Sequence, residues 1–554
     1  FKSYNQGQTV LFPSRLDERI PDDSPVRLIS RIVDGLDLTQ LIASYESGGT
    51  TPYHPRMLLK VVFHAYMNNT YSCRRIASAM ERDIHYMWLS GSQYPSFSTI
   101  NRFRSEHIKD CVNQLFVQAV EVLVEMGQVR PDVQYIDGTR IESVASKYTF
   151  VWRKSTETNK GKLEEKIRSV LSQIDEGIAR DHASESDMGT SPIDSASLEK
   201  MIDKINECTR QQEARTKEEK QAVKQREKQV KELRKHQQKP QEYENKPDIM
   251  GDRNSYSKTD LDATFMRMKE DAMNKGQTKP GYNLQTGTEN QYITNFGLYP
   301  DPGDTLTLAP FLYLLRFDKL PKELCADAGY GSEENYFLME ESGIEAYVKY
   351  NYFHKEQKRS FKNDPFRQEN LYYNPQGDCL VCPMGQRMHL IGEKTAPRVC
   401  GMESIISRYQ AINCDGCPLK GLCTKAKGYR IIEVNHRLVQ YKQKARERLL
   451  SEQGVIHRKK RPIEPEAVFG QMKFNMAYKR FRHKGFEKVQ MDFGVFAMAF
   501  NLKKLCKNLS KEAFAALFGK IRLYVRMLFS LKSQLYFPQS KVSRKWYFKR
   551  KNAA

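Results

Sequence analysis

The chain has 554 residues and a formal net charge of +22, with 89 Lys and Arg against 67 Asp and Glu. This length gives room for several domains and excludes a single small module. The excess of positive charge favours a polyanionic partner, with nucleic acid first and an anionic membrane second.

Residues 1–125 have the pattern of an all-α domain. Apolar residues recur with helical spacing over 58–63 and again over 76–80, and turn-forming residues lie between them at 68–70. We therefore predict a helical N-terminal domain over residues 1–125 with room for three helices, in which residues near 57 to 107 would add DNA binding.

Serines mark where two of these helices begin. Ser72 is expected to cap the second helix, and either Ser96 or Ser98 the third. This spacing suits a helix-turn-helix, in which the third helix presents polar side chains to a DNA groove. The residues that it would present are Asn101, Arg102 and Arg104. The alternative is a helical domain that serves only packing.

A β-favouring run from Val133 to Asp137 opens a second kind of domain. We interpret it as the first strand of a hairpin, ending in an acid. Strand-like segments resume at 281–285 and 291–294, which predicts that the same sheet continues there.

The segment between these strands, residues 156–246, is strongly charged and nearly lacks apolar residues over 217–235. A break containing Asp187, Gly189 and Pro192 divides it. We predict a solvated two-helix hairpin inserted into the surrounding domain. A dimerising coiled coil is the weaker alternative because apolar residues at the required spacing are too sparse.

An α/β alternation follows the insertion. Residues 323–327 predict a strand that leads into a glycine loop, and Ser332 can cap a helix over 335–341. A further strand is expected at 345–349.

Three acids stand at the ends of predicted elements. Asp137 and Asp327 each end a strand, and Glu466 follows Pro465, which marks a helix start. Side chains at such places can meet at one sheet edge. Three converging carboxylates can hold two divalent ions, as in-line phosphodiester cleavage requires. Taken alone, an Asp at a strand end is more often a turn or capping residue.

Three ordered motifs carry a resemblance to a known family. They are Asp137-Gly138-Thr139, Ala326-Asp327-Ala328-Gly329-Tyr330 and Glu466-Ala467-Val468-Phe469-Gly470-Gln471-Met472-Lys473. Together they resemble the active-site signatures of bacterial insertion-sequence DDE transposases. In particular, they are similar to the family numbered eleven-eighty-two, which is related to the insertion sequence four and five groups. The resemblance extends from the helical N-terminal region to Leu505.

The resemblance implies an α/β catalytic core, RNase H-like, with a mixed sheet flanked by helices and a large helical insertion. The all-α N-terminal domain would precede this core, and a small zinc-ribbon-like module would interrupt it. The segments of the core would be residues 126–155, 247–375 and 455–510.

The activity that the resemblance implies is that of a transposase. Such an enzyme binds the terminal inverted repeats of its element, cuts the DNA ends by hydrolysis and joins the 3′-OH ends to target DNA. Asp137, Asp327 and Glu466 would hold two Mg²⁺ or Mn²⁺ ions, and the enzyme would act on double-stranded DNA as a homodimer. The alternatives are an inactive DNA-binding regulator and a metal nuclease that joins no ends.

The motif around Glu466 also places basic residues. Relatives carry a Lys after six intervening residues, and Lys473 stands there, where it would contact DNA phosphate. The Arg that relatives have four residues before the Glu is replaced by Pro462, with Arg461 one residue further back, and Lys459 holds the position of their Tyr. Whether the second DNA strand is cut through a hairpin or by direct hydrolysis therefore stays open.

Glu464 competes with Glu466 for the third acidic position. Residues two apart on a helix lean to opposite faces, and Glu464 precedes Pro465, so the two acids are not expected to bind the same ions. We prefer Glu466 because of its spacing to Lys473.

A basic run follows this helix, and we interpret it as a DNA clamp. Its members are Lys479, Arg480, Arg482, His483 and Lys484, of which Arg480, Arg482 and Lys484 would bind phosphates. The alternative is a solvated charged turn.

Six of the eleven cysteines crowd between Cys379 and Cys423. In a reducing compartment this clustering favours metal binding over disulfides, and we expect a zinc-binding module over 376–430. The family-like pattern favours as structural Zn²⁺ ligands Cys382, Cys414, Cys417 and Cys423, which leaves Cys379 and Cys400 as spares. Free buried thiols are the alternative.

Residues 511–554 form the last predicted segment. Its most apolar part, 513–535, is interrupted by four basic residues and predicts a basic amphipathic helix instead of a membrane span. The tail from Lys541 to Lys551 would add DNA contacts. The first residues lack a secretory signal, so we expect a cytoplasmic, nucleoid-associated protein without a membrane partner.

Overall fold

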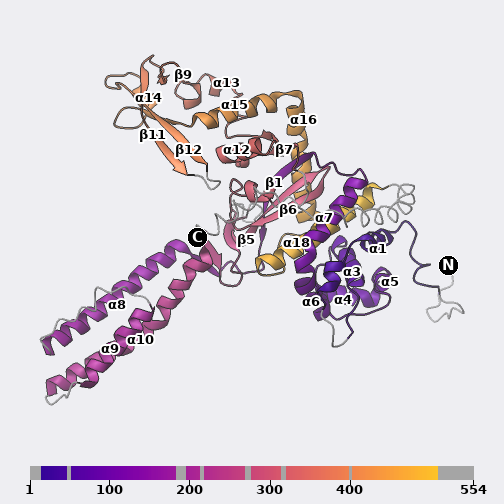
Figure 1. Cartoon of the computed structure of the whole chain (residues 1–554), viewed down its shortest axis with the longest axis horizontal. Helices are drawn as coiled ribbons and strands as arrows, with labels where there is room; N and C mark the ends of the chain where they lie inside the picture. Colours follow the sequence, from indigo (N-terminus) through magenta and orange to yellow (C-terminus); the bar gives the residue numbers. More distant parts are fainter. Residues whose placement is uncertain are drawn as a thin grey trace, which may run out of the picture. The chain divides into compact units, whose positions relative to one another are not determined.

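The computed structural model describes seven stretches of the chain (Figure 1): residues 14–45, 51–181, 195–211, 217–268, 276–313, 320–397 and 402–509. They divide into two compact units. The first is formed by the described residues up to Ile141 and from Asn283 onward, and the second by Glu142–Tyr282. The predicted C-terminal helix and tail, as well as Cys400, lie outside the described residues.

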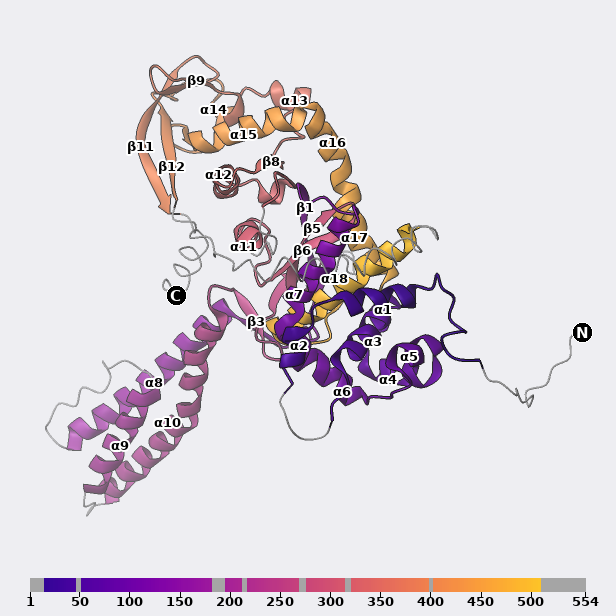
Figure 2. The ribbon, with the colours of Figure 1, turned by 45° about the vertical axis from the view of Figure 1, so that its right-hand side comes forward.

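The N-terminal part of the first unit is helical, as expected from its apolar spacing (Figure 2). Its helices are α1 (Pro25–Gly35), α2 (Thr39–Ala43), α3 (Pro55–Met67), α4 (Cys73–Arg82), α5 (Ile84–Ser90), α6 (Phe97–Arg102), the π-helical turn η1 (Phe103–Ile108) and α7 (Lys109–Glu125). The long helix α18 (Phe486–Asn508) packs against α3 and α7, so the end of the described chain completes the core of this helical part.

The predicted helix-turn-helix needs two corrections, an added helix and the missing cap at Ser72, and the choice between Ser96 and Ser98 is decided. A further helix, α5, lies between the second and third predicted helices, because Asp83 caps it by accepting a hydrogen bond from the backbone N–H of His85. Ser96, and not Ser98, caps α6 through the N–H of Thr99. Ser72 stands at the start of α4, but its side chain makes no capping hydrogen bond.

A mixed sheet forms the centre of the first unit, with the strand order β5-β1-β7-β8 and β6 paired to β5. The strands are β1 (Val133–Glu142), β5 (Thr278–Glu289), β6 (Tyr292–Tyr299), β7 (Glu323–Ala326) and β8 (Glu345–Val348). β1, β7 and β8 are parallel, whereas β5 and β6 form an antiparallel hairpin. The prediction that β1 opens a hairpin and ends at Asp137 is wrong, because β1 continues to Glu142 and pairs with β7.

Helices cover this sheet and fix its last strands. The helix α12 (Glu333–Glu341) begins at Ser332, whose hydroxyl accepts a hydrogen bond from the N–H of Asn335, as predicted. α12, α11 (Leu308–Tyr313) and α15 (His436–Leu450) bury apolar side chains against β1, β7 and β8 in one core. The predicted α/β alternation is therefore confirmed in this part of the chain.

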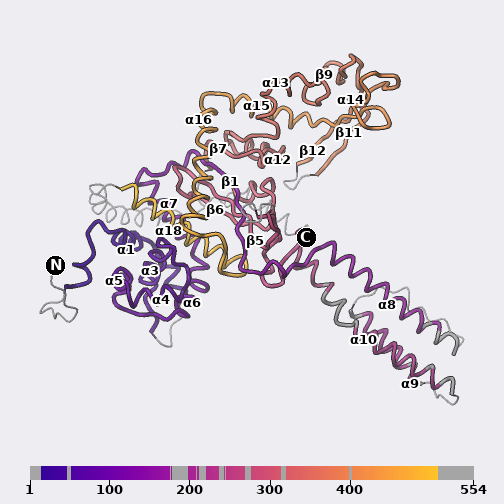
Figure 3. Tube along the Cα trace, turned by 180° about the vertical axis from the view of Figure 1, so that it is seen from behind, coloured from indigo at the N-terminus to yellow at the C-terminus, as the bar shows by residue number. Residues whose placement is uncertain are grey.

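In the described residues of the second unit there are three helices, and not the predicted hairpin of two (Figure 3). They are α8 (Arg153–Asp181), α9 (Ser195–Gln211) and α10 (Lys217–Met250). The apolar residues Leu198, Ile202 and Ile205 of α9 are buried with residues of α8 and α10 in one core. Helical spacing of these three residues is the signal that the prediction missed. Short strands join the helices to the chain: β2 (Phe150–Trp152), β3 (Ser255–Ser257) and β4 (Thr264–Arg267).

The cysteine-rich segment forms an antiparallel sheet of five strands in the first unit. They are β9 (Tyr372–Asn374), β10 (Cys379–Val381), β11 (Arg387–Pro397), β12 (Glu403–Ala411) and β13 (Ile431–Val434), and short helical turns accompany them: α13 (Arg359–Lys362), η3 (Gln368–Asn370) and α14 (Lys420–Cys423).

A nearly continuous helical run carries the last motif. It consists of α16 (Glu452–Arg461), the π-helical turn η4 (Pro462–Glu466), α17 (Ala467–Gly470) and the π-helical turn η5 (Gln471–Asn475). The prediction that a helix starts at Pro465 is wrong, because Pro465 lies inside this run. None of the helices in the described stretches is long and apolar enough to cross a membrane.

Candidate active site

Two of the predicted acids come together because of the strand register. The parallel pairing of β1 with β7 places Tyr135 opposite Cys325. Asp137 and Asp327 each follow two residues later, so they lie at the same level of the sheet. Asp327 also accepts a hydrogen bond from the N–H of Gly329 (2.8 Å), which turns the chain away from the strand after the acid.

The third acid joins them through a single guanidinium group. Nη2 of Arg461 lies 2.9 Å from Oδ2 of Asp137 and 3.6 Å from Oδ2 of Asp327, and its Nη1 lies 3.2 Å from Oε1 of Glu466. The Arg461 side chain is 11% exposed, whereas those of Asp327 and Glu466 are 41% and 55% exposed. The structure thus brings all three predicted acids around one buried cation.

The π-helical turn η4 explains how Arg461 reaches this place. In a π-helix residues five apart are bonded, so Arg461 and Glu466 come onto one face. Pro465 lies inside this turn, and in a regular α-helix its ring would clash with the carbonyl four residues earlier, which disfavours α-helical geometry here. In an α-helix, Arg461 would stand one residue too early to share a face with Glu466. The π-helical turn brings the two side chains onto the same face.

Glu464 points away from this cluster. It is 8% exposed, and its Oε2 accepts a hydrogen bond from the N–H of Gln291 (2.6 Å) in the turn between β5 and β6. Of the two competing glutamates, Glu466 is the one that shares Arg461 with the aspartates.

Burial dominates the electrostatics of the innermost acid. It raises the pKa of Asp137 to about 6, because desolvation disfavours the carboxylate. The positive charge of Arg461 opposes this rise, and the negative charges of Asp327 and Asp304 add to it. A positively charged group bound to the Asp137 carboxylate would favour its ionised form.

Asp304 is a fourth acid at this site that sequence reasoning missed. Its Oδ1 accepts hydrogen bonds from Nδ2 of Asn283 and Nε2 of Gln285, each at 2.9 Å. A Cβ at Gly138 would meet the ends of the Asp304 and Gln285 side chains, so these would have to shift if another residue stood beside Asp137. Asp304 lies in an irregular loop that contains Asp, Pro and Gly. An acid in such a segment is usually a turn residue, so nothing in the sequence marked Asp304 as part of the site.

Two lysines border the acids. Lys473 is 5% exposed and donates a hydrogen bond to Oγ1 of Thr139 (2.6 Å), two residues beyond Asp137 on β1. Lys349, which the sequence did not single out, follows β8, and its charge interacts with those of Asp327 and Glu466. The acidic cluster therefore has basic side chains close by.

The acids suit divalent metal ions by their chemistry, since hard cations prefer carboxylate oxygens. No three His, Cys, Asp or Glu side chains in the described stretches converge closely enough to hold a metal as they stand. At the acidic cluster the carboxylates are arranged around a guanidinium instead.

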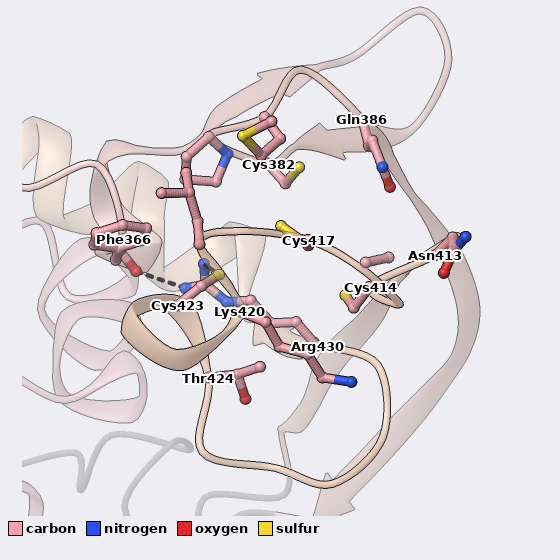
Figure 4. Close-up of a pocket in the computed structure, with 14 residues that line it drawn as sticks. Phe366, Cys382, Gln386, Asn413, Cys414, Cys417, Lys420, Cys423, Thr424 and Arg430 are labelled. Atoms are coloured by element: carbon pink, nitrogen blue, oxygen red, sulfur yellow. Dashed lines mark hydrogen bonds between the residues drawn. The ribbon is translucent and has the colours of Figure 1, made fainter.

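The four predicted zinc ligands line one small pocket (Figure 4): Cys382, Cys414, Cys417 and Cys423. Gly385 and Gly416, which lie beside these cysteines, have left-handed φ angles of 78° and 70°, a conformation that favours glycine. Nη1 of Arg430 lies 2.9 Å from Sγ of Cys423, so that sulfur has a cationic partner. Cys379 is buried outside this pocket.

A basic groove lies on the helical N-terminal part. It is lined by residues from the start of α4, from α6 and from the basic run, among them Arg74, Asn101, Arg102 and Arg482. Asn101, Arg102, Arg480, Arg482 and Lys484 are exposed. The two segments predicted to bind DNA thus meet in one groove.

Arg104 is not available to DNA, so its prediction as a groove-reading residue is wrong. It is 1% exposed and lies 2.7 Å from Asp492 of α18. It also donates to the carbonyl of Tyr71 (3.0 Å) and to the hydroxyl of Tyr66. The turn η1 directs this side chain into the core, whereas Arg102 stays outside.

Comparison with known proteins gives two matches to family models. One is described as Transposase DDE domain and covers residues 381–506, and the other as Transposase domain (DUF772) and covers residues 14–106. No curated protein and no solved structure matches. The two matches indicate a bacterial insertion-sequence transposase family, and a DDE domain implies an RNase H-like fold, in agreement with the mixed sheet.

Proposed function

We propose that this protein is a DNA transposase that cuts the ends of its element and joins their 3′-OH groups to target DNA. The convergence of Asp137, Asp327 and Glu466 at one place carries this proposal. Both family models that match the chain are transposase models, which supports it independently.

The three carboxylates would hold two Mg²⁺ or Mn²⁺ ions. Bound ions of this kind activate the attacking oxygen and neutralise the leaving oxygen in an in-line displacement at phosphorus. Asp137 and Asp327 supply oxygens from the sheet, and Glu466 supplies them from the helical run. Asn283 and Gln285 hold Asp304 beside them, which adds negative charge to the site.

The basic side chains would orient the DNA. Lys473 is fixed by Thr139 next to Asp137, so its ammonium group can hold a phosphate near the acids. Asn101, Arg102 and Arg482 would bind the terminal inverted repeats along the groove, together with Arg480 and Lys484 beside it. A homodimer would bring the two element ends together.

The cysteine module would bind one structural Zn²⁺ through Cys382, Cys414, Cys417 and Cys423. Four thiolates close the coordination sphere, so this site would stabilise the module without taking part in the reaction. Metal analysis of the purified protein should then find about one zinc per chain. Free alkylation of all four thiols without zinc would remove this part of the proposal.

Cleavage of DNA that carries the element ends tests the active site. With Mg²⁺, the variants Asp137→Asn, Asp327→Asn and Glu466→Gln should each lose cleavage by about 10²-fold to 10³-fold or more, the scale of removing one preorganised charge contact. The matched control is Glu464→Gln, which changes a neighbouring glutamate that faces the β5–β6 turn. Cleavage that survives Asp327→Asn, or is lost equally in Glu464→Gln, would overturn this assignment.

A further inference from the structure

The guanidinium of Arg461 is shared among three acids that belong to separate parts of the chain. Nη2 contacts Asp137 on β1 and Asp327 just after β7, and Nη1 contacts Glu466 in the helical run. Nε of Arg461 is buried and has no hydrogen-bond partner. The carboxylates are therefore the partners that hold this side chain in place.

One positive charge does not neutralise this cluster. Three carboxylates contact one guanidinium, and Asp304 lies beside them, while Lys349 and Lys473 border the cluster. A divalent cation is attracted to such a cluster more strongly than a monovalent one. It would use the same atoms that Arg461 now contacts, namely the Oδ2 atoms of Asp137 and Asp327 and Oε1 of Glu466. The guanidinium and a metal ion therefore compete for these oxygens.

We propose that Arg461 is a positioning residue that gathers the three acids in the metal-free protein and is displaced when a divalent cation binds. In this role Arg461 raises the metal concentration at which the site fills, and it prevents the carboxylates from repelling one another before then. This inference rests on the proposed function, because it takes the three acids as the metal site.

The exposure of the partners allows this exchange. Glu466 and Asp327 are 55% and 41% exposed, so water and ions reach their carboxylates while Arg461 is still in place. A partly exposed ion pair is held weakly compared with a desolvated one.

Mn²⁺ binding to the full chain tests the inference without any measurement of activity. Free Mn²⁺ is followed by electron paramagnetic resonance for the wild type, for Arg461→Gln and for Arg458→Gln. Arg458 is the matched control, since it lies one turn earlier on α16 and its guanidinium stacks over Phe353 at 5.6 Å. Its replacement removes the same charge nearby without removing a contact to the acids.

Arg461→Gln should bind Mn²⁺ about 10-fold to 100-fold more tightly than the wild type, the range of a lost hydrogen bond to a charged group. Arg458→Gln should change the affinity by less than about threefold, because its charge acts only at longer range. Arg461→Lys keeps a positive charge but loses the planar guanidinium that contacts several acids at once. Its affinity for Mn²⁺ should therefore lie between those of the wild type and Arg461→Gln.

Thermal unfolding provides a second readout and a check on folding. Without metal, Arg461→Gln should melt below the wild type, and saturating Mn²⁺ should raise its melting temperature by more than it raises that of the wild type. Should Arg461→Gln fail to fold, the intermediate affinity expected of Arg461→Lys still decides the question.

Each outcome has a distinct meaning. Unchanged or weaker Mn²⁺ binding in folded Arg461→Gln overturns the inference, and so does an equal gain in Arg458→Gln. Arg461→Lys with the affinity of the wild type would do the same. If neither the wild type nor Arg461→Gln binds Mn²⁺ at the acids, and Asp327→Asn changes nothing, the proposed metal site itself fails.

Discussion

The ion pair of Arg104 with Asp492 and the group of Arg461 with three acids, both in the first unit, differ in burial. Arg104 and Asp492 are 2% and 1% exposed and form a closed pair. Arg461 is also largely buried, but two of its three acidic partners are more than a third exposed. The comparison separates a permanent structural ion pair from a group of charges that can change partners.

The hydrogen bonds that Asp492 accepts explain why its ion pair with Arg104 is permanent. Its oxygens accept hydrogen bonds from Arg104 and from the hydroxyls of Tyr66 and Tyr478, the last at 2.9 Å. His483 lies 2.9 Å from Arg104 and closes the network on one side. A charge that is fully desolvated and saturated with protein partners has no place for a ligand.

Breaking the buried pair should give the largest effect on stability. Asp492→Asn leaves the charge of Arg104 buried without a counter-charge, which should cost about 3–5 kcal/mol of unfolding free energy. Asp327→Asn, at the exposed cluster, should cost less than about 1 kcal/mol. Urea unfolding of both variants makes the comparison, and an equal loss in the two would show that burial does not separate the clusters. The paired change Arg104→Met with Asp492→Leu should recover much of the loss.

Replacing Lys473 tests whether the lysine beside Asp137 contributes to DNA cleavage. Lys473→Met removes an ammonium group held beside Asp137 and should lower the rate of DNA cleavage by about 10²-fold. Lys479→Met is the control, because Lys479 is exposed and its ammonium lies over the ring of Phe474. A single-turnover cleavage assay measures both, and equal losses would contradict a special role for Lys473.

The buried pair should also make stability depend on pH in the acid range. Arg104, His483 and the tyrosine hydroxyls hold the pKa of Asp492 below its usual value of about 3.8, against the effect of burial. A depressed pKa contributes stability that is present above the unfolded value and is lost as the pH falls through the folded one. The difference in unfolding free energy between wild type and Asp492→Asn should therefore be constant near neutral pH and shrink below about pH 4. A difference that grows on acidification would contradict this.

Single changes in the basic groove should have the smallest effects. Arg102→Ala and Arg482→Ala should each weaken DNA binding by a few-fold and lower the slope of log affinity against log salt by about one. Arg408→Ala serves as the control, since Arg408 pairs with Glu433 in the cysteine module. Fluorescence anisotropy at several salt concentrations provides the slopes. A slope that is unchanged in both variants would exclude the groove as a DNA-binding surface.

Local patterns predicted much of this structure. The strands β7 and β8, the cap at Ser332 and the acid after β7 each follow from a few neighbouring residues. The approach of Asp137 to Asp327 depends on the parallel pairing of β1 with β7, which no local pattern contains. The motif resemblance placed both acids in one site without that information.

Other features depend on backbone geometry that spacing alone does not show. The π-helical turns shift the faces of Arg104 and Arg461, so one arginine enters the core and the other reaches the acids. Asp304 reaches the site from an irregular loop, and Gly138 leaves the space for it. In each case the deciding contact comes from a distant part of the chain.

Strand transfer is the most direct test of the central claim that Asp137, Asp327 and Glu466 form the active site of a transposase. The substrate is a duplex that ends in the terminal repeat of the element with a free 3′-OH, mixed with a target plasmid and Mg²⁺. The wild type and Glu464→Gln should join this end to the plasmid, whereas Asp327→Asn should not. Failure of the wild type to join this end, or joining that persists in Asp327→Asn, would contradict the account.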